Sequence, residues 1–284
     1  TATAGSTPSY NPSLAINSSG NLNVAYYSSE FHPNYNNIAL RTSTDGGLTW
    51  GARRDVTANV SGGTFNPSLA INSSDNLYVA YYSSEFNPNY NNIALRTSTD
   101  GGLTWGARRD VTANTTVDSL NPSLTLDSTN NLYVAYYSLE YNATYNNIAL
   151  RTSTDGGVTW GARTDVTANT TLNSYFPVIT RNAANNFFIL YQSKEYSGAN
   201  NLALRASNIN NYGTRKDITT YGIYDAYNPK VVVRTSTGAL YMAYYSYEYD
   251  ASYYNIALRT STDGGVTWGA RRDVTANTAA NSYS

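Results

Sequence analysis

Glutamate is rare in this chain, and each copy stands directly before an aromatic residue. The five pairs are Glu30-Phe31, Glu85-Phe86, Glu140-Tyr141, Glu195-Tyr196 and Glu248-Tyr249. Polar loops follow them, and four of these loops contain a tyrosine that we single out: Tyr35, Tyr90, Tyr145 and Tyr254. Carboxylates and amides hydrogen-bond to sugar hydroxyls, and an aromatic ring packs against the C–H face of a sugar. These residue types therefore favour a shallow carbohydrate site that recurs along the chain.

A second interpretation of the same glutamates is structural. An arginine recurs in the strand expected after each loop, at Arg41, Arg96, Arg151, Arg205 and Arg259. A glutamate that pairs with the arginine of its own or a neighbouring repeat would hold the repeats in register through a charge-assisted bond. Both interpretations stay open, because a paired carboxylate can still accept a hydrogen bond from a ligand.

The spacing of these residues reflects a unit of about 55 residues that runs through the chain five times. Four copies carry the motif Ser-x-Asp-x-Gly-x-Thr-Trp, with its Asp and Trp at Asp45 and Trp50, Asp100 and Trp105, Asp155 and Trp160, and Asp263 and Trp268. The aspartate can accept hydrogen bonds from its own turn, and the glycines allow positive φ. We therefore expect this motif to be structural. The fourth copy lacks it between Ser207 and Tyr212, so that repeat is expected to be the most mobile or the most specialised.

Each unit reads as four short antiparallel strands. In the second unit these are expected at 66–71, 77–82, 93–97 and 108–112, with a polar loop at 83–91 and the Asp-Gly-Gly turn between the last two strands. Five such units predict an all-β, five-bladed β-propeller with four strands per blade. The chain is expected to be a single domain, 1–284, with blades at approximately 11–59, 66–114, 121–169, 176–220 and 228–277.

The four motifs resemble the boxes of the Asp-box (BNR-repeat) propellers, a family that includes sialidases and other carbohydrate-active or carbohydrate-binding proteins. The resemblance covers all five units. It implies that the box hairpins, between the third and fourth strands, lie on the face opposite the binding or catalytic site. The site face would then be built by the loops between strands two and three and by the links between blades.

The residues argue against an enzyme. A glycosidase gathers two carboxylates, or a tyrosine nucleophile in the sialidase manner, at one centre, and the resemblance implies that sialidase-like catalysis also needs three converging arginines. Here arginines and glutamates are spread evenly, and residues 21–59 and 76–114 differ only at Asn23/Tyr78 and His32/Asn87. We therefore expect a protein without catalytic residues that recognises glycans through repeated weak sites. A sialidase-like glycoside hydrolase is kept as an alternative.

Composition excludes several classes of partner and cofactor. The net charge of −1 does not suit nucleic acid, and no apolar stretch is long enough to span a membrane. Cysteine is absent, His32 is the single histidine, and no motif predicts a metal or another cofactor. The polar, Tyr-rich composition and the start at Thr1 favour an extracellular or cell-surface protein. So do six sequons, at Asn17, Asn59, Asn72, Asn114, Asn142 and Asn169.

The two ends of the chain repeat the same segment. Residues 1–10 and 274–283 both match the link between two blades, so only one of them can occupy the last junction of a closed ring of five. The spare segment is either a loose tail or a contact to a second molecule. This predicts a rival function, a self-assembling extracellular structural or adhesive subunit that forms head-to-tail filaments.

Overall fold

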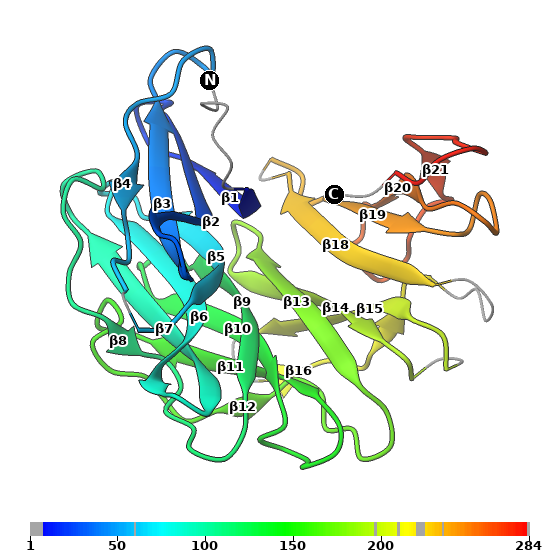
Figure 1. Ribbon diagram of the computed structural model, residues 1–284. Helices are drawn as coiled ribbons and strands as arrows, with labels where there is room; N and C mark the ends of the chain where they lie inside the picture. Colours follow the sequence, from blue (N-terminus) through cyan, green and yellow to red (C-terminus); the bar gives the residue numbers. More distant parts are fainter. Residues whose placement is uncertain are drawn as a thin grey trace. The chain divides into compact units, whose positions relative to one another are not determined.

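The computed structural model describes residues 8–59, 61–195, 198–208, 211–219, 225–234 and 236–282 (Figure 1). Most of the N-terminal link segment and Tyr196 therefore lie outside the described residues. The described part is all β, and it is a five-bladed β-propeller fold, as predicted. The chain divides into two compact units, Thr1–Ser138 with Arg151–Arg163, and Leu139–Leu150 with Thr164–Ser284. The single-domain organisation stays a prediction.

The first unit contains the whole of blades 1 and 2. Blade 1 consists of β1 (Ser9–Ile16), β2 (Leu22–His32), β3 (Tyr35–Ser43) and β4 (Arg54–Asp55). Blade 2 consists of β5 (Thr64–Ile71), β6 (Leu77–Asn87), β7 (Tyr90–Ser98) and β8 (Arg109–Asp110). In both blades the strands pair antiparallel in chain order.

Blade 3 draws its strands from both units. It consists of β9 (Ser119–Leu126), β10 (Leu132–Ser138), β11 (Asn147–Ser153) and β12 (Thr164–Asp165), again in chain order.

The second unit contains blades 4 and 5. Blade 4 consists of β13 (Ser174–Arg181), β14 (Asn186–Ser193), β15 (Asn201–Asn208), β16 (Asn211–Tyr212) and β17 (Lys216–Asp217). Here β16 is an additional short strand that pairs with β15 where the other blades have their box turn. Blade 5 consists of β18 (Ala226–Val233), β19 (Leu240–Ser246), β20 (Asn255–Ser261) and β21 (Arg272–Asp273).

The second strand is longer than predicted in blades 1 and 2. The segment expected as a polar loop at 83–91 continues β6 to Asn87, and β7 already begins at Tyr90. Asn87 pairs with Tyr90 after a register shift, so the loop is reduced to a two-residue turn. The fourth strand is shorter than predicted, two residues in blade 2, because only Arg109 and Asp110 continue the ladder.

The box turn forms as the motif predicts. In blade 2 the Asp100 carboxylate accepts hydrogen bonds from the backbone N–H groups of Leu103 and Thr104, both at 3.0 Å. The Ser98 hydroxyl accepts one from the Gly102 N–H at 2.8 Å, and Gly102 has a φ of +82°. Trp105 packs against the apolar cluster between blades 1 and 2. The box is therefore a structural hairpin.

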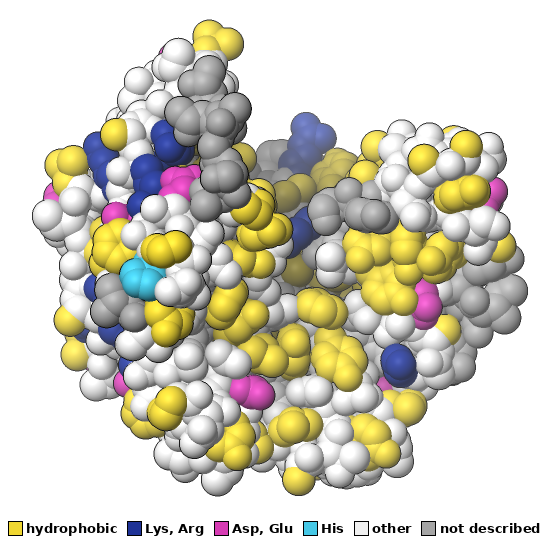
Figure 2. All heavy atoms as spheres, in the orientation of Figure 1, with side chains coloured by type: hydrophobic (Ala, Val, Ile, Leu, Met, Phe, Trp, Pro, Cys, Tyr) yellow, Lys and Arg dark blue, Asp and Glu magenta, His cyan; other side chains and the backbone are white. Residues whose placement is uncertain are grey.

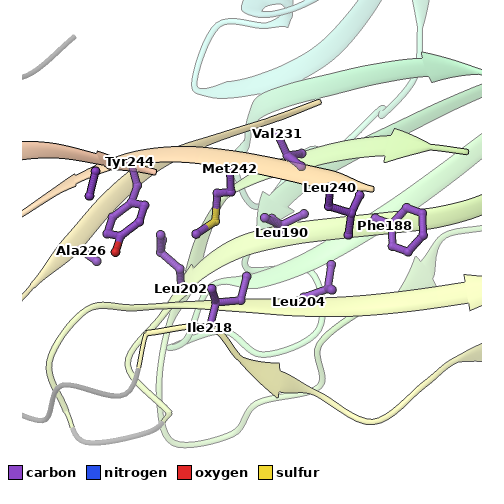
Figure 3. Close-up of a cluster of buried hydrophobic side chains, with 11 residues drawn as sticks. Phe188, Leu190, Leu202, Leu204, Ile218, Ala226, Val231, Leu240, Met242 and Tyr244 are labelled. Atoms are coloured by element: carbon purple, nitrogen blue, oxygen red, sulfur yellow. The ribbon is translucent and has the colours of Figure 1, made fainter. Parts of the chain in front are cut away.

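Apolar cores lie between adjacent sheets. In the first unit Leu69, Leu77, Val79 and Tyr81 of blade 2 pack against Ala25, Ile38, Leu40 and Val56 of blade 1. In the second unit Phe188, Leu190, Leu202 and Leu204 of blade 4 meet Leu240, Met242 and Tyr244 of blade 5 (Figure 3). In both units one face of a blade thus packs against the neighbouring blade, which explains why the second strands carry large apolar residues on that face.

Candidate functional site

The glutamates form ion pairs inside their own blades. Glu85 approaches Nε of Arg108 at 2.9 Å, and it also accepts hydrogen bonds from the Tyr81 hydroxyl at 3.1 Å and the Ser83 hydroxyl at 3.2 Å. Arg108 makes a second ion pair, of 2.6 Å, with Asp110. The cluster lies on the sheet face that packs toward blade 1, because Tyr81 belongs to the core there.

In three blades the partner of the glutamate differs from the arginine predicted. The sequence argument chose the third-strand arginines, but Glu30, Glu85 and Glu195 pair with Arg53, Arg108 and Arg215, which directly precede the fourth strand. The third-strand arginines instead hold the box hairpin. Arg41, for example, donates to the Gly51 carbonyl at 3.0 Å and to the Tyr26 hydroxyl at 3.3 Å. The interpretation of Glu–Arg pairing within a blade is thus right, with the wrong arginine.

Blade 5 has the most enclosed version of this cluster. The Glu248 side chain is only 2 % exposed and pairs with Arg271 at 3.3 Å and with the third-strand Arg259 at 3.6 Å. Burial raises the pKa of Glu248, and the two guanidinium groups oppose that rise. Exposure of the side chain increases to 14 % at Glu85, 19 % at Glu195 and 31 % at Glu30. Glu140 is half-buried. A ligand can therefore reach the carboxylates of blades 1 and 4 far better than that of blade 5.

The aromatic residues after the glutamates are exposed. Phe31 and Phe86 are each 39 % exposed, Tyr141 is 41 % and Tyr249 is 44 % exposed. We call these four rings the aromatic row. Phe31 and Phe86 belong to β2 and β6 and lie on the opposite side of the strand from their glutamates, because successive side chains of a strand alternate. Arg271 lies 5.9 Å from the ring centroid of Tyr249, over its face.

The loop tyrosines divide into two kinds. Tyr35, Tyr90 and Tyr145 are half-buried at equivalent positions. Tyr254 occupies a different position from the one predicted: the Asn255 side chain donates to the Tyr253 carbonyl, as the Asn37 side chain donates to the Tyr35 carbonyl. The true equivalent of Tyr35 is thus Tyr253.

Tyr254 instead belongs to an aromatic cluster. Its ring stacks on Tyr247 at 3.8 Å and packs edge-on against Tyr245 and Tyr227 at 5.1 and 5.7 Å. Desolvation and its tyrosine neighbours raise the pKa of Tyr254 far above the ordinary value.

The sequence argument missed a second set of aromatic rings at the same end of the blades. Tyr10 and Tyr27 stack across β1 and β2 at 5.2 Å, and Phe65 and Tyr82 stack across β5 and β6 at 5.3 Å. Tyr27 touches Phe65 edge-on at 5.4 Å, so the four rings form a continuous ladder over two blades. The sequence contained a signal for this ladder. Tyr10 and Phe65 each stand two positions before a proline of the first strand, and each is paired with a tyrosine of the second strand, Tyr27 or Tyr82.

The loops beside these aromatic residues are held by the links between blades. Asp118, just before β9, accepts hydrogen bonds from the Asn91 backbone at 2.7 Å and the Asn91 side chain at 3.3 Å. Asp225 does the same for Asn200 at 2.7 and 3.0 Å. This end of each blade is opposite the box, because the box follows the third strand and these loops follow the antiparallel second strand. The arrangement agrees with the one that the resemblance implies.

The C-terminal link lies against its own blade. The Ser282 N–H donates to the Tyr254 carbonyl at 2.7 Å, the bond that Ser174 makes to Asn146 and Ala226 makes to Asn200. Asn281 accepts from the Tyr254 N–H at 2.9 Å, as Asp225 does for Asn200. The described part of this tail therefore lies against its own blade; most of the N-terminal copy is outside the described residues, and a contact to a second molecule stays a prediction.

The predicted sequons differ in how their amide nitrogens lie. The Nδ2 atoms of Asn114 and Asn169 donate to Ser119 and Ser174, and that of Asn59 is buried. At these three positions the amide nitrogen is bonded or buried, and glycosylation there stays a prediction. Asn17, Asn72 and Asn142 instead use Oδ1 to accept from the backbone of their own turns, and their glycosylation stays a prediction.

Within the described ranges, no group of acidic, histidine or cysteine side chains could hold a metal ion. His32 packs beside Tyr35 at 5.1 Å, and Figure 2 shows the histidine with hydrophobic side chains next to it. The search of the described residues for a helix that could cross a membrane found none.

Solved structures share this fold at low sequence identity. A protein of unknown function from Dyadobacter fermentans matches with a TM-score of 0.72 and 12 % identity, over 96 % of this chain and 85 % of that one. A Hadza microbial sialidase matches with a TM-score of 0.65 and 15 % identity, over 95 % of this chain and 59 % of that one. An α-L-arabinanase from Penicillium chrysogenum, complexed with arabinobiose, matches with a TM-score of 0.59 and 15 % identity, over 92 % of this chain and 80 % of that one. No curated protein matches the chain.

These neighbours correct the expectation that the protein is not an enzyme. The argument took near-identical blades as evidence against an active centre, yet the sialidase and the arabinanase carry out catalysis on this same fold. Near-identity of the blade framework is therefore no argument against catalysis, because loops and not the repeated framework carry the chemistry of such folds.

A family model described as a BNR repeat-like domain matches residues 2–209. The match covers more than half of the chain and three of its four boxes. Together with the box turns and the five blades, it shows that this protein belongs to the BNR-repeat (Asp-box) family.

Proposed function

We propose that this protein is a carbohydrate-related propeller that binds glycans at the blade ends carrying the aromatic row. The observation that carries the proposal is the exposure of Phe31, Phe86, Tyr141 and Tyr249, 39 to 44 %, at one position of four blades. The apolar core does not need these exposed rings. A ring with one open face can stack on the apolar side of a sugar. Neighbours of the same fold that act on carbohydrates support this proposal.

Polar groups next to the rings would orient the sugar hydroxyls. Among the glutamates whose ion pairs are given, Glu30 has the most exposed side chain. Asn91 at the start of β7 and Asn200 just before β15 are held in place by Asp118 and Asp225. The rigid loops reduce the entropy lost on binding. Repetition over several blades suits a polymeric or clustered glycan, since several weak sites on one molecule add avidity.

The charge distribution favours neutral sugars over acidic ones. In blades 1 and 2, Arg53 and Arg108 each pair with two carboxylates, and Arg41 and Arg96 donate to backbone carbonyls of the box hairpin. A carboxylated sugar such as a sialic acid needs guanidinium groups directed at the ligand. We therefore favour recognition of neutral glycans over the sialidase-like alternative. We also propose that the protein is extracellular, where such ligands are accessible.

The test is a binding screen with matched variants. Wild-type protein, Phe86→Ala and Tyr141→Ala are run through native gels that contain neutral polysaccharides (arabinan, galactan, xylan) or acidic ones. Losing one stacked ring should raise Kd about two- to tenfold, the value of one aromatic contact. Leu103→Ala is the control, because Leu103 is 64 % exposed at the opposite end of blade 2.

The same mixtures are analysed for released oligosaccharides, which measures catalysis directly. Retardation by a neutral polysaccharide that Phe86→Ala weakens and Leu103→Ala does not would support the proposal. No retardation in any gel, or equal losses in both variants, would contradict it.

A further inference from the structure

Four of the five blades fix the start of their third strand through one polar side chain of the link that follows the blade. A backbone N–H at or just before the third strand donates to the side-chain oxygen of an aspartate or asparagine in that link. The four pairs, donor first, are Asn91–Asp118 at 2.7 Å, Asn146–Asn173 at 2.8 Å, Asn200–Asp225 at 2.7 Å and Tyr254–Asn281 at 2.9 Å. An acceptor oxygen therefore recurs at one position of the link.

The link between blades 1 and 2 has no side chain at this position. Gly63 stands where Asp118 stands in the next link. The link still lies against the same part of its blade, because the Thr64 hydroxyl donates to the Asn36 carbonyl at 3.3 Å. Asn36 corresponds to Asn91, and the two blades agree in the bounds of their third strands and in the register of the second and third strands. The Asn36 N–H therefore faces a link residue that offers no side-chain acceptor.

Two donors converge on the position of the acceptor. In blade 2 the backbone and the side-chain amide of Asn91 both donate to Oδ1 of Asp118, at 2.7 and 3.3 Å. In blade 4 the same two groups of Asn200 donate to Oδ1 of Asp225, at 2.7 and 3.0 Å. The link residue is an asparagine in two of the four pairs, so the acceptor does not have to carry a charge. The equivalent donors of Asn36 need an oxygen that Gly63 cannot supply.

Aromatic rings lie beside the same position. A Cβ atom added to Gly63 would come within 2.5 Å of Cζ of Phe65, so the glycine allows the Phe65 ring to lie over the link. Tyr27 contacts this ring edge-on at 5.4 Å, and both rings are half-buried. All of these residues belong to the first unit. The junction thus combines amide donors with aromatic rings, the groups that bind the hydroxyls and the C–H face of a sugar.

We propose that the junction between blades 1 and 2 is a sugar-binding site in which a ligand oxygen takes the place that the Asp118 carboxylate has at the next junction. The backbone and side-chain amides of Asn36 donate to this oxygen, and the rings of Phe65 and Tyr27 pack against the C–H face of the same sugar. The inference rests on the proposed function and narrows it to one junction. The oxygen is a hydroxyl of a neutral sugar or the carboxylate of a uronic acid, and the experiment distinguishes the two.

The test exchanges the two junctions within one chain. Gly63→Asp/Phe65→Leu gives the first link the residues of the second, Asp118 and Leu120, and should fill the site. The reciprocal variant, Asp118→Gly/Leu120→Phe, should create an equivalent site in blade 2. Ser61→Asp adds a carboxylate at an exposed position of the first link and is the control for added charge. Thermal melting checks that each variant is folded.

Nuclear magnetic resonance of the isotope-labelled full chain reports each junction separately. The probes are the trisaccharides of arabinan, galactan and xylan, with trigalacturonic acid as the acidic sugar. In the wild type the Asn36 amide signal should respond at lower sugar concentration than the Asn91 signal. Gly63→Asp/Phe65→Leu should raise the Kd measured at Asn36 at least about tenfold, because two hydrogen bonds and a stacked ring are lost. Ser61→Asp should leave this Kd unchanged, and Asn91 should respond like Asn36 in the reciprocal variant.

Hydrogen exchange without sugar tests the unfilled position by itself. The Asn36 amide should exchange faster than the Asn91 amide, and Gly63→Asp/Phe65→Leu should slow it. Equal protection of the two amides in the wild type would overturn this inference and leave the proposed function untouched, as would a Kd at Asn36 that is the same in all variants. A wild type that binds none of the probes would contradict both. A response of Asn36 to trigalacturonic acid alone would support the site, with a carboxylate as the acceptor, and contradict the preference for neutral sugars.

Discussion

Single residues of the box act through local hydrogen bonds to an aspartate. Asp45 accepts from Thr49 and Ser43, and these bonds lower its pKa to about 2; the pKa of Asp263 is lowered to about 2 in the same way. The bonds to Thr104, Thr159 and their serines lower the pKa values of Asp100 and Asp155 further. The aspartate of each box thus holds the turn in its ionised form.

This predicts a loss of stability in acid. A carboxylate whose pKa is lowered on folding stabilises the protein fully above the unfolded pKa of 3.8, and the contribution disappears as the pH falls toward 2. We expect the melting temperature to fall steeply between pH 4 and pH 2. Asp100→Asn should lower the melting temperature at pH 7 and flatten its acid dependence. Asp250→Asn keeps an oxygen that can accept the single bond from the Ser252 N–H, so it should change both much less. A parallel acid profile for the two variants would contradict the prediction.

The Glu–Arg clusters are stabilising only as intact units. Arg108 is 17 % exposed and holds both Glu85 and Asp110. Arg108→Leu leaves two partly buried carboxylates without their cation, so urea unfolding should show a loss of about 2 kcal/mol. Arg54→Leu is the control: its guanidinium donates to the Gly101 carbonyl at an exposed site, and its loss should cost below about 1 kcal/mol. Equal costs would show that burial of the cluster does not matter.

At the scale of elements, the first strands of the blades are tied to one another by serine side chains. The Ser13 hydroxyl of β1 accepts from the Leu69 N–H of β5 at 2.9 Å, and the Ser68 hydroxyl of β5 accepts from the Leu124 N–H of β9 at the same distance. Blade 3 carries Ser123 at the same position, whereas blade 4 has Val178 and blade 5 has Lys230. The serine is therefore a feature of the first three blades.

Removal of such a tie should have a measurable cost. Ser68→Ala leaves the Leu124 N–H without its acceptor, and we expect a loss of about 1 kcal/mol in the free energy of unfolding. Ser74→Ala in the exposed turn after β5 is the control and should cost close to zero. Hydrogen exchange of the Leu124 amide reports the same bond, and unchanged protection in Ser68→Ala would contradict the assignment.

At the scale of the whole molecule, stability within the first unit depends on contacts between neighbouring blades. Leu40 of blade 1 is fully buried against the box of blade 2, whereas Leu48 in the box turn of blade 1 is 86 % exposed. Leu40→Ala should cost about 2–4 kcal/mol in the free energy of unfolding. Leu48→Ala should cost close to zero, since its side chain is already in water. Chemical unfolding measures both, and equal costs for the two variants would contradict this ranking.

Predictions from sequence held where the relevant contacts are local. The box turn joins residues two to four apart, so Asp100, Gly102 and Ser98 could be assigned roles from spacing alone. Pairing partners could not: two arginines lie within reach of each glutamate along the chain, and the strand geometry selects Arg108 over Arg96 for Glu85. A one-residue shift in the loop likewise exchanged the positions of Tyr253 and Tyr254, because aromatic content alone does not define register.

The sequence by itself determined the repeat, the alternation of the strands and the box turns, since all three depend on interactions within about 15 residues. The tertiary structure alone decided which faces are covered. Leu69 of blade 2 is 6 % exposed because residues of blade 1 pack against it, whereas Leu103 of the same blade is 64 % exposed. The difference arises because burial depends on contacts with a neighbouring blade, and a residue's own segment does not specify those contacts.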